Sequence, residues 1–260
     1  MLLSVILIFV VLFFTFLIFK TKNNKKAKLI IYSLCIIFFT LNILLPCTET
    51  LPSTLYVTNV ENGINVTLRE GLKYAHFNCG ASDSDTYINS LPKAKCEKLD
   101  FLYISKSNKT TNDVTKQLIP YKPQTTVITE FAKGNINETN IELPKNTIIS
   151  NSYTHKFNNE ITIQIVDTYP ASCVIIKTRK KIVLVSYGDN SDLDTVFETY
   201  GKPDILILSE DLPKAIPEDI DTLVISCDSD IIVNKNLATI KSQTKNFHAT
   251  AENGGIKIIL

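Results

Sequence analysis

Several features that are common in enzymes are scarce or missing in this sequence. Its 260 residues include no tryptophan, three histidines and eight glycines. The glycines form neither a GxGxxG nor a GxxxxGK(S/T) pattern, which excludes the common phosphate-binding loops. The histidines lack HxH or HxxxH spacing and the cysteines form no CxxC pair, so the usual sequence signs of a zinc site are missing. With 45% hydrophobic residues, the composition also excludes disordered, collagen-like and disulfide-dense small proteins.

Acidic residues are absent from residues 1–46, where 32 residues are apolar. Two runs, residues 1–19 and 29–45, each approach the roughly 30 Å of a bilayer core at about 1.5 Å per helical residue. The short loop between them carries five lysines, and the positive-inside rule places such a loop in the cytoplasm. We therefore predict a two-pass protein of the cell membrane, with a transmembrane hairpin at 1–46 and an extracytoplasmic domain at 47–260.

Three other interpretations of this apolar region stay open. A cleaved signal peptide normally begins with positive charge, which is missing here, and a second apolar run follows. A hairpin buried in a protein core is another. The sequence LLPC at 44–47 is similar to a lipoprotein cleavage site, although Pro46 stands where a small residue is expected.

The rest of the chain is acidic overall. Without the five loop lysines it has 22 basic and 26 acidic residues, a net charge of −4. Non-specific DNA binding depends on lysine and arginine neutralising phosphates, so direct DNA binding is not expected. The basic run KTRKK at 177–181 is interpreted as a solvated hairpin.

Short runs of β-branched and aromatic residues alternate with a few helical stretches, which favours an α/β (α+β) sandwich. Residues 133–159 are interpreted as irregular or as weak edge strands, and 205–208 and 222–226 as buried strands. The expected helices are 83–91, 112–118 and 193–200. The expected strands are 55–60, 64–70, 73–78, 101–104, 125–129, 161–167, 173–178, 181–185, 205–208, 222–226, 247–250 and 256–260.

A series of short motifs follows the same order as one known domain. NVENGIN at 59–65 stands where that domain has an Asp-Val-Gly-Gln-Gly-Asp-like turn, and FNCG at 77–80 stands at its Ile-Asp-x-Gly. SKSNKTT at 105–111 takes the place of Ser-His-x-His-x-Asp-His. Further along, SCVIIKTRKKIVLVSYGD at 172–189 matches a strand pair ending in Thr-Gly-Asp. DILIL at 204–208 precedes the place of a His-His-Gly-Ser motif, and TAENGGIKI at 250–258 is similar to the closing Thr-x-x-x-Gly-x-Ile.

This order resembles the C-terminal metallo-β-lactamase-like domain of ComEC-type competence proteins, which are associated with DNA internalisation. The resemblance spans almost all of residues 47–260. It implies a metallo-β-lactamase-like αββα sandwich, preceded here by two transmembrane helices, and a relation to DNA uptake. With two predicted spans the chain lacks that family's multi-helix channel, so we expect an accessory or scaffold beside a channel or other competence protein, or a decayed fragment.

The positions that supply metal ligands in this family hold other residues here. Lys106, Asn108, Thr110 and Thr111 replace the first histidine motif, and Ser209, Glu210 and Asp211 replace the second. A lysine ammonium group repels a divalent cation, and Asn and Thr are poor zinc ligands. Asp189 alone keeps a ligand type, and one carboxylate cannot hold a dinuclear centre. The resemblance therefore predicts a noncatalytic member with no catalytic, cofactor-binding or metal-ligating residues and no cofactor.

Two rival hypotheses stay open. In the first, Asp189, Glu210 and Asp211 form a carboxylate cluster that binds a hard cation, and the protein is a metal-dependent hydrolase or nuclease with a remodelled site. In the second, the domain is an extracellular interaction module unrelated to DNA. We identify no small-molecule substrate.

Histidines and cysteines receive structural interpretations. We expect His76 and His248 to be structural histidines within strands and His155 to be solvated in the polar linker. The disulfide bond proposed most readily joins Cys79 and Cys96. Cys173 and Cys227 are expected to be buried thiols. Asn-x-Ser/Thr sequons occur at Asn65, Asn108 and Asn137 and would be acceptors only in a eukaryotic secretory pathway.

Overall fold

The computed structural model describes residues 25, 32–33, 52–60, 63–79, 96–105, 116–137, 142–168, 171–188, 193–210, 213, 216, 219–226 and 235–260. The chain divides into two compact units, Met1–Leu51 and Pro52–Leu260. Among the described residues, no helix combines the length and the apolar character needed to cross a bilayer. The two predicted spans, 1–19 and 29–45, lie outside those residues apart from Tyr32 and Ser33.

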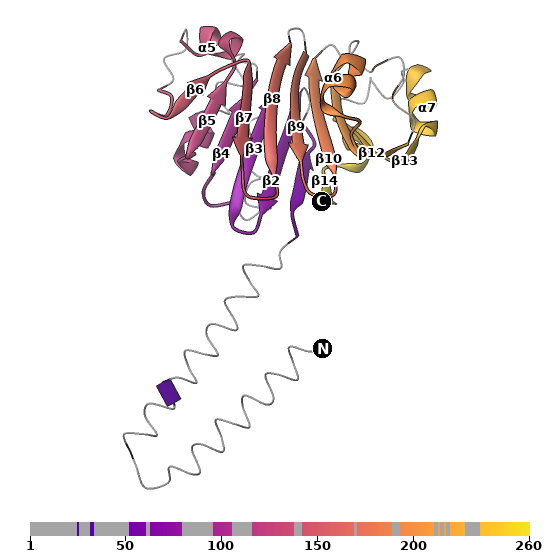
Figure 1. Cartoon of the computed structure of the whole chain (residues 1–260). Helices are drawn as coiled ribbons and strands as arrows, with labels where there is room; N and C mark the ends of the chain where they lie inside the picture. The colour runs from indigo at the N-terminus through magenta and orange to yellow at the C-terminus, as the bar shows by residue number, and fades with distance from the viewer. Residues whose placement is uncertain are drawn as a thin grey trace. The chain divides into compact units, whose positions relative to one another are not determined.

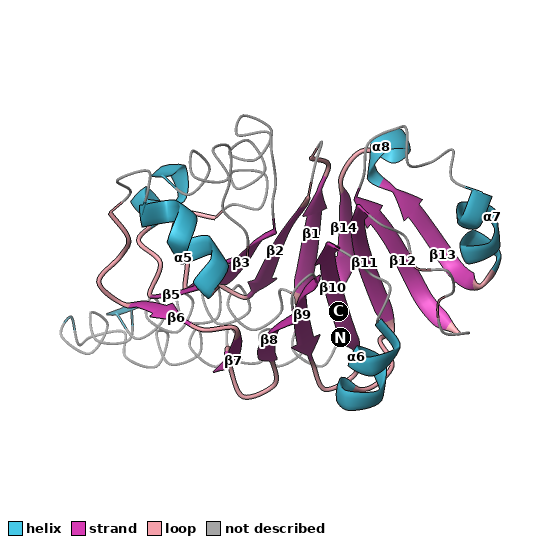
Figure 2. Cartoon of the chain, turned by 90° about the horizontal axis from the view of Figure 1, so that it is seen from above, coloured by secondary structure: helices cyan, strands magenta, loops and turns pink. Residues whose placement is uncertain are grey.

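The second unit contains two seven-stranded sheets that face each other (Figures 1 and 2). In the first, which we call sheet A, the strands from β14 to β3 are antiparallel and those from β3 to β6 are parallel. Its order in space is β14 (Ile256–Ile259), β1 (Thr54–Thr58), β2 (Ile64–Glu70), β3 (Lys73–Cys79), β4 (Phe101–Ile104), β5 (Thr125–Ile128) and β6 (Thr147–Ile149).

The second sheet, sheet B, has the converse arrangement. Its strands from β13 to β10 are parallel and those from β10 to β7 are antiparallel. Its order in space is β13 (Thr244–Ala249), β12 (Ile220–Ser226), β11 (Ile205–Glu210), β10 (Ile182–Gly188), β9 (Ala171–Lys177), β8 (Thr162–Thr168) and β7 (Ser152–Lys156).

The main core lies between the sheets, because side chains alternate along each strand and one phase is apolar in nearly every strand. Val66, Phe77 and Tyr103 from sheet A meet Val185, Ile207 and Val224 from sheet B. The other face of each sheet is covered by helices. Ala132 and Ile136 of α5 (Glu130–Asn137) pack over sheet A. Over sheet B lie Leu193 and Val196 of α6 (Leu193–Tyr200) and Leu237 and Ile240 of α7 (Lys235–Ser242).

This architecture confirms the predicted two-sheet sandwich with helices. The expected strands 64–70 and 101–104 and the helix 193–200 coincide with β2, β4 and α6. The predicted buried strands become β11 and β12 inside sheet B. The expected helix 83–91 lies outside the described residues, as does 112–115, while 116–118 is helical and continues into the 3-10 turn η1 (Ile119–Tyr121).

The segment predicted to be irregular or weak edge strands proves to be mixed. It provides β6 and β7, which are indeed edge strands, each at the end of its sheet. It also contains most of α5, which was not predicted. Its glycine and two asparagines lower its helix propensity. The helix is stabilised instead by burial of Ala132 and Ile136. It is also capped by Thr129, whose Oγ1 accepts a hydrogen bond from the Ala132 amide at 3.0 Å.

Two opposite edges of the sandwich matter below. We call the rim the edge where the parallel strands end, at Cys79, Ile104 and Ile128 in sheet A and at Gly188, Glu210 and Ser226 in sheet B. Both sheets share this edge, because Ser226 Oγ donates to the Gly63 carbonyl oxygen at 3.0 Å, and Gly63 precedes Ile64, which pairs with Cys79.

We call the base the opposite edge. It holds three hairpin tips, at residues 71–72, 158–160 and 179–180, together with Ser53 and Leu260. Hydrogen bonds join these pieces, from Leu260 N to Ser53 O at 2.9 Å, from Lys181 Nζ to Ile259 O at 3.2 Å and from Lys73 Nζ to Phe157 O at 3.3 Å. The rim is at the top and the base at the bottom of Figure 1.

Candidate functional site

A row of polar side chains crosses sheet B at the rim. Strand pairing places five residues of five neighbouring strands directly beside one another, and they lie on the face that turns toward sheet A, because Tyr187 belongs to the core between the sheets. The row runs from β8 to β12 and consists of Asp167, Ser172, Tyr187, Ser209 and Ser226. We call it the polar row. It replaces the apolar core at the rim and forms the floor of this edge.

Most of this row is buried. Tyr187, Ser209 and Ser226 are 5%, 1% and 0% exposed. Its only charged member, Asp167, is partly exposed and accepts a hydrogen bond from Ser172 Oγ at 2.7 Å. Burial raises the pKa of the Asp167 carboxyl, and the Ser172 hydroxyl opposes that rise by stabilising the charged form.

Sheet A contributes a smaller set of hydroxyls to the rim. Ser105 follows β4, and its amide donates to the Asn78 carbonyl oxygen at 3.1 Å. Its side chain is 2% exposed, and its Oγ has no hydrogen-bond partner among the described residues. The Ser105 carbonyl oxygen accepts from Thr129 Oγ1 at 2.6 Å, which ties the end of β4 to the end of β5. The chain therefore leaves β4 from a tightly bonded position.

Asn151 connects this part of the rim to Asp167. It lies between β6 and β7, where the chain passes from sheet A to sheet B. Its Oδ1 accepts from the Glu130 amide at 3.0 Å, and its carbonyl oxygen accepts from the Asp167 amide at 2.8 Å. Asn151 thus holds the start of α5 and the end of β8 together.

Two parallel strands end at the rim where predicted motif positions begin in the sequence. Gly188 and Glu210 are paired residues at the ends of the parallel strands β10 and β11, so Asp189 and Asp211 each follow directly on adjacent strands. Ser209 lies in the polar row. Asp189, Asp211, the side chain of Glu210, and the positions Lys106, Asn108, Thr110 and Thr111 lie outside the described residues. The predicted carboxylate cluster therefore stays a prediction.

Asp167 and Ser172 were not among the predicted site residues. The signal was available in the strand 161–167, because Ile163 and Ile165 face the core and alternation puts Asp167 on the same face. The alignment of Asp167 and Ser172 in one row with Tyr187, Ser209 and Ser226 could not be predicted, because it depends on the register of strands that are far apart in sequence.

His76 and His248 lie in strands as predicted. The His76 ring is fully buried in β3, where Nδ1 lies 2.8 Å from Thr67 Oγ1, and burial lowers its pKa to about 3. His248 Nε2 lies 2.8 Å from the Gly254 carbonyl oxygen. The interpretation of His155 was wrong. It belongs to β7 and stacks on Phe101 with ring centroids 4.7 Å apart, because alternation along this edge strand turns Tyr153, His155 and Phe157 toward sheet A.

The cysteine predictions are confirmed in one case and wrong in another. Cys173 is a buried thiol, as expected, with Sγ 3.4 Å from Ser186 Oγ. Cys96 is a free thiol, so the proposed bond with Cys79 is not formed. The apolar layer over sheet A buries Cys96, which raises the pKa of its thiol to about 12. Cys47, Cys227 and the side chain of Cys79 lie outside the described residues.

Asn65 cannot be a glycosylation acceptor in the folded domain, because its side chain is fully buried in β2. It lies directly opposite Asn78 in the β2–β3 pair, and within the described part of the chain neither side-chain amide has a hydrogen-bond partner. Asn108 and the side chain of Asn137 lie outside the described residues.

A pair of metal ions does not fit the described part of the rim. Dinuclear hydrolytic sites need several imidazoles and carboxylates that converge. The polar row and Ser105 offer one carboxylate, one phenol and serine hydroxyls. Within the described ranges, no three His, Cys, Asp or Glu side chains are grouped closely enough to hold a metal ion. This floor is suited to hydrogen bonding.

The domain has the metallo-β-lactamase fold. It is similar to the metallo-beta-lactamase fold protein YhfI from Bacillus subtilis, with a TM-score of 0.54 and 14% identity over 80% of this chain and 100% of that one. Zn(2+)-bound PqqB from Methylobacterium extorquens gives a TM-score of 0.54 and 7% identity over 80% and 100%. Igni18, a metallo hydrolase from Ignicoccus hospitalis, gives 0.50 and 8% over 80% and 99%.

Comparison of sequences gives no further relative. No protein-family model matches this sequence, and no curated protein matches it. At these identities the structural likeness shows the fold alone.

Proposed function

We propose that this chain is a membrane-anchored protein with a metallo-β-lactamase fold that does not catalyse metal-dependent hydrolysis. The observation that carries the proposal is the polar row, where hydroxyl groups and one carboxylate occupy the rim from which a dinuclear site would be built. The sequence of the adjoining loops supports it, because Lys106 and Asn108 stand at positions of the first ligand motif and Ser209 at the second. A positive ammonium group there opposes the binding of a divalent cation.

Membrane anchorage is the second part of the proposal. It rests on the apolar runs 1–19 and 29–45, the five lysines between them and the lack of acidic residues up to Pro46. In this arrangement the lysine loop is cytoplasmic and the fold lies on the outer side of the cell membrane.

The third part is a supporting role in DNA uptake, beside a separate channel subunit. The positions of the ComEC-like motifs support it, because each lies at a strand boundary of the fold. NVENGIN joins β1 to β2, FNCG begins within β3, and SKSNKTT follows β4. The segment 172–189 covers β9 and β10, and 204–208 runs into β11.

A cleavage assay separates this proposal from the hydrolase hypothesis. The full chain, purified in detergent, is incubated with fluorescently labelled DNA in the presence of Zn²⁺ or Mn²⁺, with Asp189→Ala as the matched variant. We expect no cleavage by either protein. Metal-dependent cleavage that Asp189→Ala abolishes would overturn the noncatalytic proposal and favour a remodelled carboxylate site.

The role in DNA uptake needs a separate experiment, because loss of catalysis does not identify a partner. Cross-linking of the full chain in its native membrane, followed by mass spectrometry, is expected to identify a channel or another competence protein. A defined partner with no relation to DNA would contradict this part and favour the interaction-module hypothesis.

A further inference from the structure

The base of the domain carries several basic side chains that form no ion pair with the described carboxylates. Lys73, Lys156 and Lys180 are exposed, and Lys181 lies beside them. The Lys73 and Lys181 ammonium groups donate to the carbonyl oxygens of Phe157 and Ile259. In the described part of the chain, none of these four lysines has a carboxylate within ion-pair distance.

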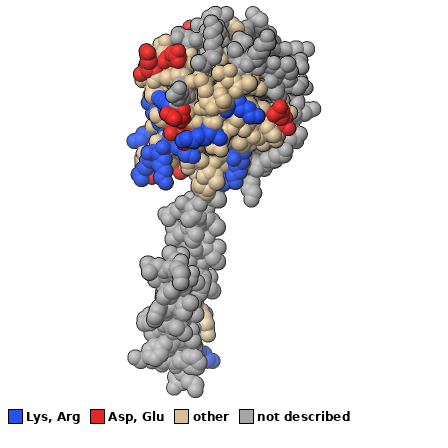
Figure 3. All heavy atoms as spheres, turned by 90° about the vertical axis from the view of Figure 1, so that its right-hand side faces the viewer, with Lys and Arg blue, Asp and Glu red and all other residues tan. Residues whose placement is uncertain are grey.

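Several carboxylates at the base are already paired. Glu160 Oε1 lies 2.9 Å from an Arg179 guanidinium nitrogen, and Asp221 Oδ1 lies 2.7 Å from Lys245 Nζ. Asp219 lies 3.7 Å from Lys202 Nζ. These pairs neutralise their own cations. Glu70, Asp100 and Asp204 are further carboxylates at the base, where they accept hydrogen bonds from neutral donors, so they offset part of the positive charge of the four lysines. Figure 3, which shows the right-hand side of the domain, has more lysine and arginine than acidic side chains over its lower part, with acidic side chains among them.

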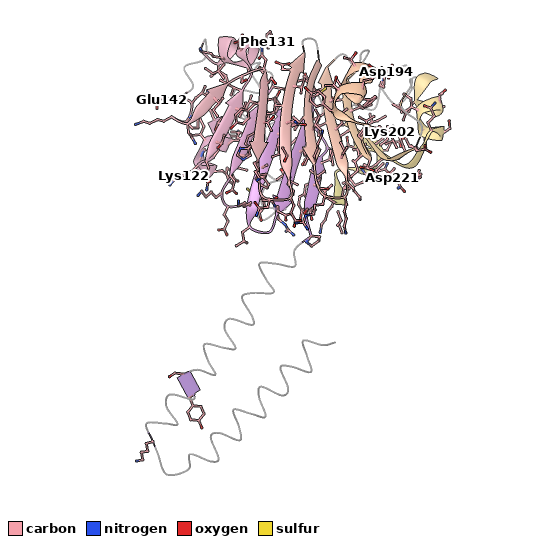
Figure 4. The ribbon with its side chains drawn as sticks, in the orientation of Figure 1. Lys122, Phe131, Glu142, Asp194, Lys202 and Asp221 are labelled. Atoms are coloured by element: carbon pink, nitrogen blue, oxygen red, sulfur yellow. The ribbon has the colours of Figure 1, made fainter. Side chains whose placement is uncertain are left out.

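The described part of the rim carries charges of both signs. Glu130 and the exposed Lys133 lie in α5, Asp194 lies in the first turn of α6, and Glu252 lies in α8 (Thr250–Asn253). Figure 4 places Phe131 and Asp194 at the top of the domain and Lys122 toward the bottom.

The base also presents an apolar side chain to solvent. Leu72, at the tip of the β2–β3 hairpin, is 72% exposed, the largest value among the exposed large hydrophobic residues of the described part. Ile259, at the end of β14, is 56% exposed. Leu72 directly precedes the exposed Lys73. An apolar tip among cations is typical of surfaces that bind the interface of an anionic membrane.

The chain itself limits where this edge can lie. Pro52 begins the folded unit, and Ser53 is part of the base. Only residues 46–51 separate Pro52 from the end of the second apolar run. Six residues span at most about 20 Å when fully extended. If the run crosses the bilayer, the base cannot be far from the lipid headgroups.

We propose that the base binds anionic phospholipid headgroups through Lys73, Lys156, Lys180 and Lys181, with Leu72 inserted at the interface. This inference rests on the membrane anchorage in the proposed function, and it gives the anchored domain a defined orientation with its rim away from the bilayer. The rim is then the edge that faces a soluble or membrane-borne partner.

The lack of tryptophan in the chain allows a direct test. Leu72→Trp introduces a single fluorophore at the base, and Phe131→Trp introduces one at the rim as the matched control. Phe131 is also exposed, at 52%. Each full-length variant is reconstituted into nanodiscs of phosphatidylcholine, with and without phosphatidylglycerol, and quenching by brominated lipid is compared with quenching by aqueous acrylamide.

We expect Leu72→Trp to be quenched by brominated lipid and protected from acrylamide when phosphatidylglycerol is present, and Phe131→Trp to show the reverse. Protection should be lost at 1 M salt, where the Debye length falls to about 3 Å. In the Leu72→Trp background, Lys180→Gln should lower the ratio of docked to free domain about fivefold, since one lysine near an anionic surface is worth about 1 kcal/mol. Lys133→Gln, on α5, should leave the ratio unchanged.

Two negative results have different meanings. A chain that alkaline carbonate removes from membranes contradicts the proposed anchorage itself. A chain that resists extraction but leaves Leu72→Trp open to acrylamide in discs with phosphatidylglycerol overturns the docking proposal and leaves the anchorage standing.

Discussion

At the scale of single residues, His76 couples the stability of the domain to pH. Its folded pKa of about 3 lies below the ordinary value of 6.5, so the folded state keeps the ring neutral while the unfolded chain takes up a proton. The stability that depends on a neutral ring is therefore fully present above about pH 6.5 and is lost as pH falls toward 3.

We predict that His76→Gln removes this dependence, because glutamine stays neutral and can still bond the Thr67 hydroxyl. The free energy of unfolding of the parent chain should fall relative to the variant by up to about 1.4 kcal/mol per pH unit below pH 6. Urea unfolding followed by circular dichroism at several pH values measures the difference. Parallel curves for the two proteins would contradict a buried neutral ring.

Asp167 makes the stability of the domain depend on pH in the opposite direction. Burial raises its folded pKa above the ordinary 3.8, so the folded state binds this proton more tightly than the unfolded chain does. Its contribution to stability is thus greatest at low pH and is lost as pH rises above about 3.8 through the folded pKa.

We predict that Asp167→Asn raises the free energy of unfolding at neutral pH, because the amide removes the cost of a half-buried charge and still accepts from Ser172 Oγ. The gain should shrink toward pH 4. Ser172→Ala is the contrasting variant, since it removes the hydroxyl that stabilises the carboxylate and should destabilise the domain. A loss of stability in Asp167→Asn at neutral pH would show that the ionised carboxylate, with its hydrogen bond from Ser172, is net stabilising.

At the scale of elements, the strands could be predicted from local pattern and several helices could not. β2 and β4 are recognisable because β-branched and aromatic residues are concentrated between turn residues. α5 contains Gly134, Asn135 and Asn137, which disfavour an isolated helix, and it depends on burial of Ala132 and Ile136 under sheet A. α7 is equally short, and its contact through Leu237 and Ile240 is tertiary.

The candidate site was predictable only in part for the same reason. Each motif position could be assigned to the end of a strand from the sequence, as with Ser209 after the apolar run 205–208. The polar row could not, because it requires the register of five strands between residues 167 and 226. Likewise, His155 lies in a polar stretch of sequence, and only the pairing of β7 with β8 reveals that it turns toward Phe101.

The pairing of β14 with β1 at the edge of sheet A offers a test at this scale. A Cβ atom on Gly255 would lie 2.8 Å from the Val57 carbonyl oxygen and 3.4 Å from Thr58 Cα, so the approach of β14 to β1 requires glycine. We predict that Gly255→Ala destabilises the domain by about 1–3 kcal/mol, as overpacking does elsewhere. Glu252→Ala, nearby and exposed, should change stability by less than about 0.5 kcal/mol. Equal effects of the two substitutions in thermal unfolding would contradict the close contact.

At the scale of the whole molecule, the fold is one found in hydrolases, whereas the chemistry of the described rim favours hydrogen bonding. The metallo-β-lactamase fold occurs in metal-dependent hydrolases such as the one from Ignicoccus hospitalis, and a fold alone does not fix a function. Here the floor of the rim is rich in hydroxyl groups. In our proposal, the membrane anchor and the lysines of the base orient the domain at the membrane. A domain that keeps the scaffold and presents its rim outward is suited to binding another protein.

The central claim is that this scaffold has lost its metal centre, and metal content tests it most directly. The full chain in detergent is equilibrated with Zn²⁺ and, separately, Mn²⁺ at micromolar concentration, passed through a desalting column without chelator, and measured by inductively coupled plasma mass spectrometry. The account predicts far less than one metal ion per chain, unchanged in Asp189→Ala. One or two ions retained per chain, and lost in that variant, would contradict it.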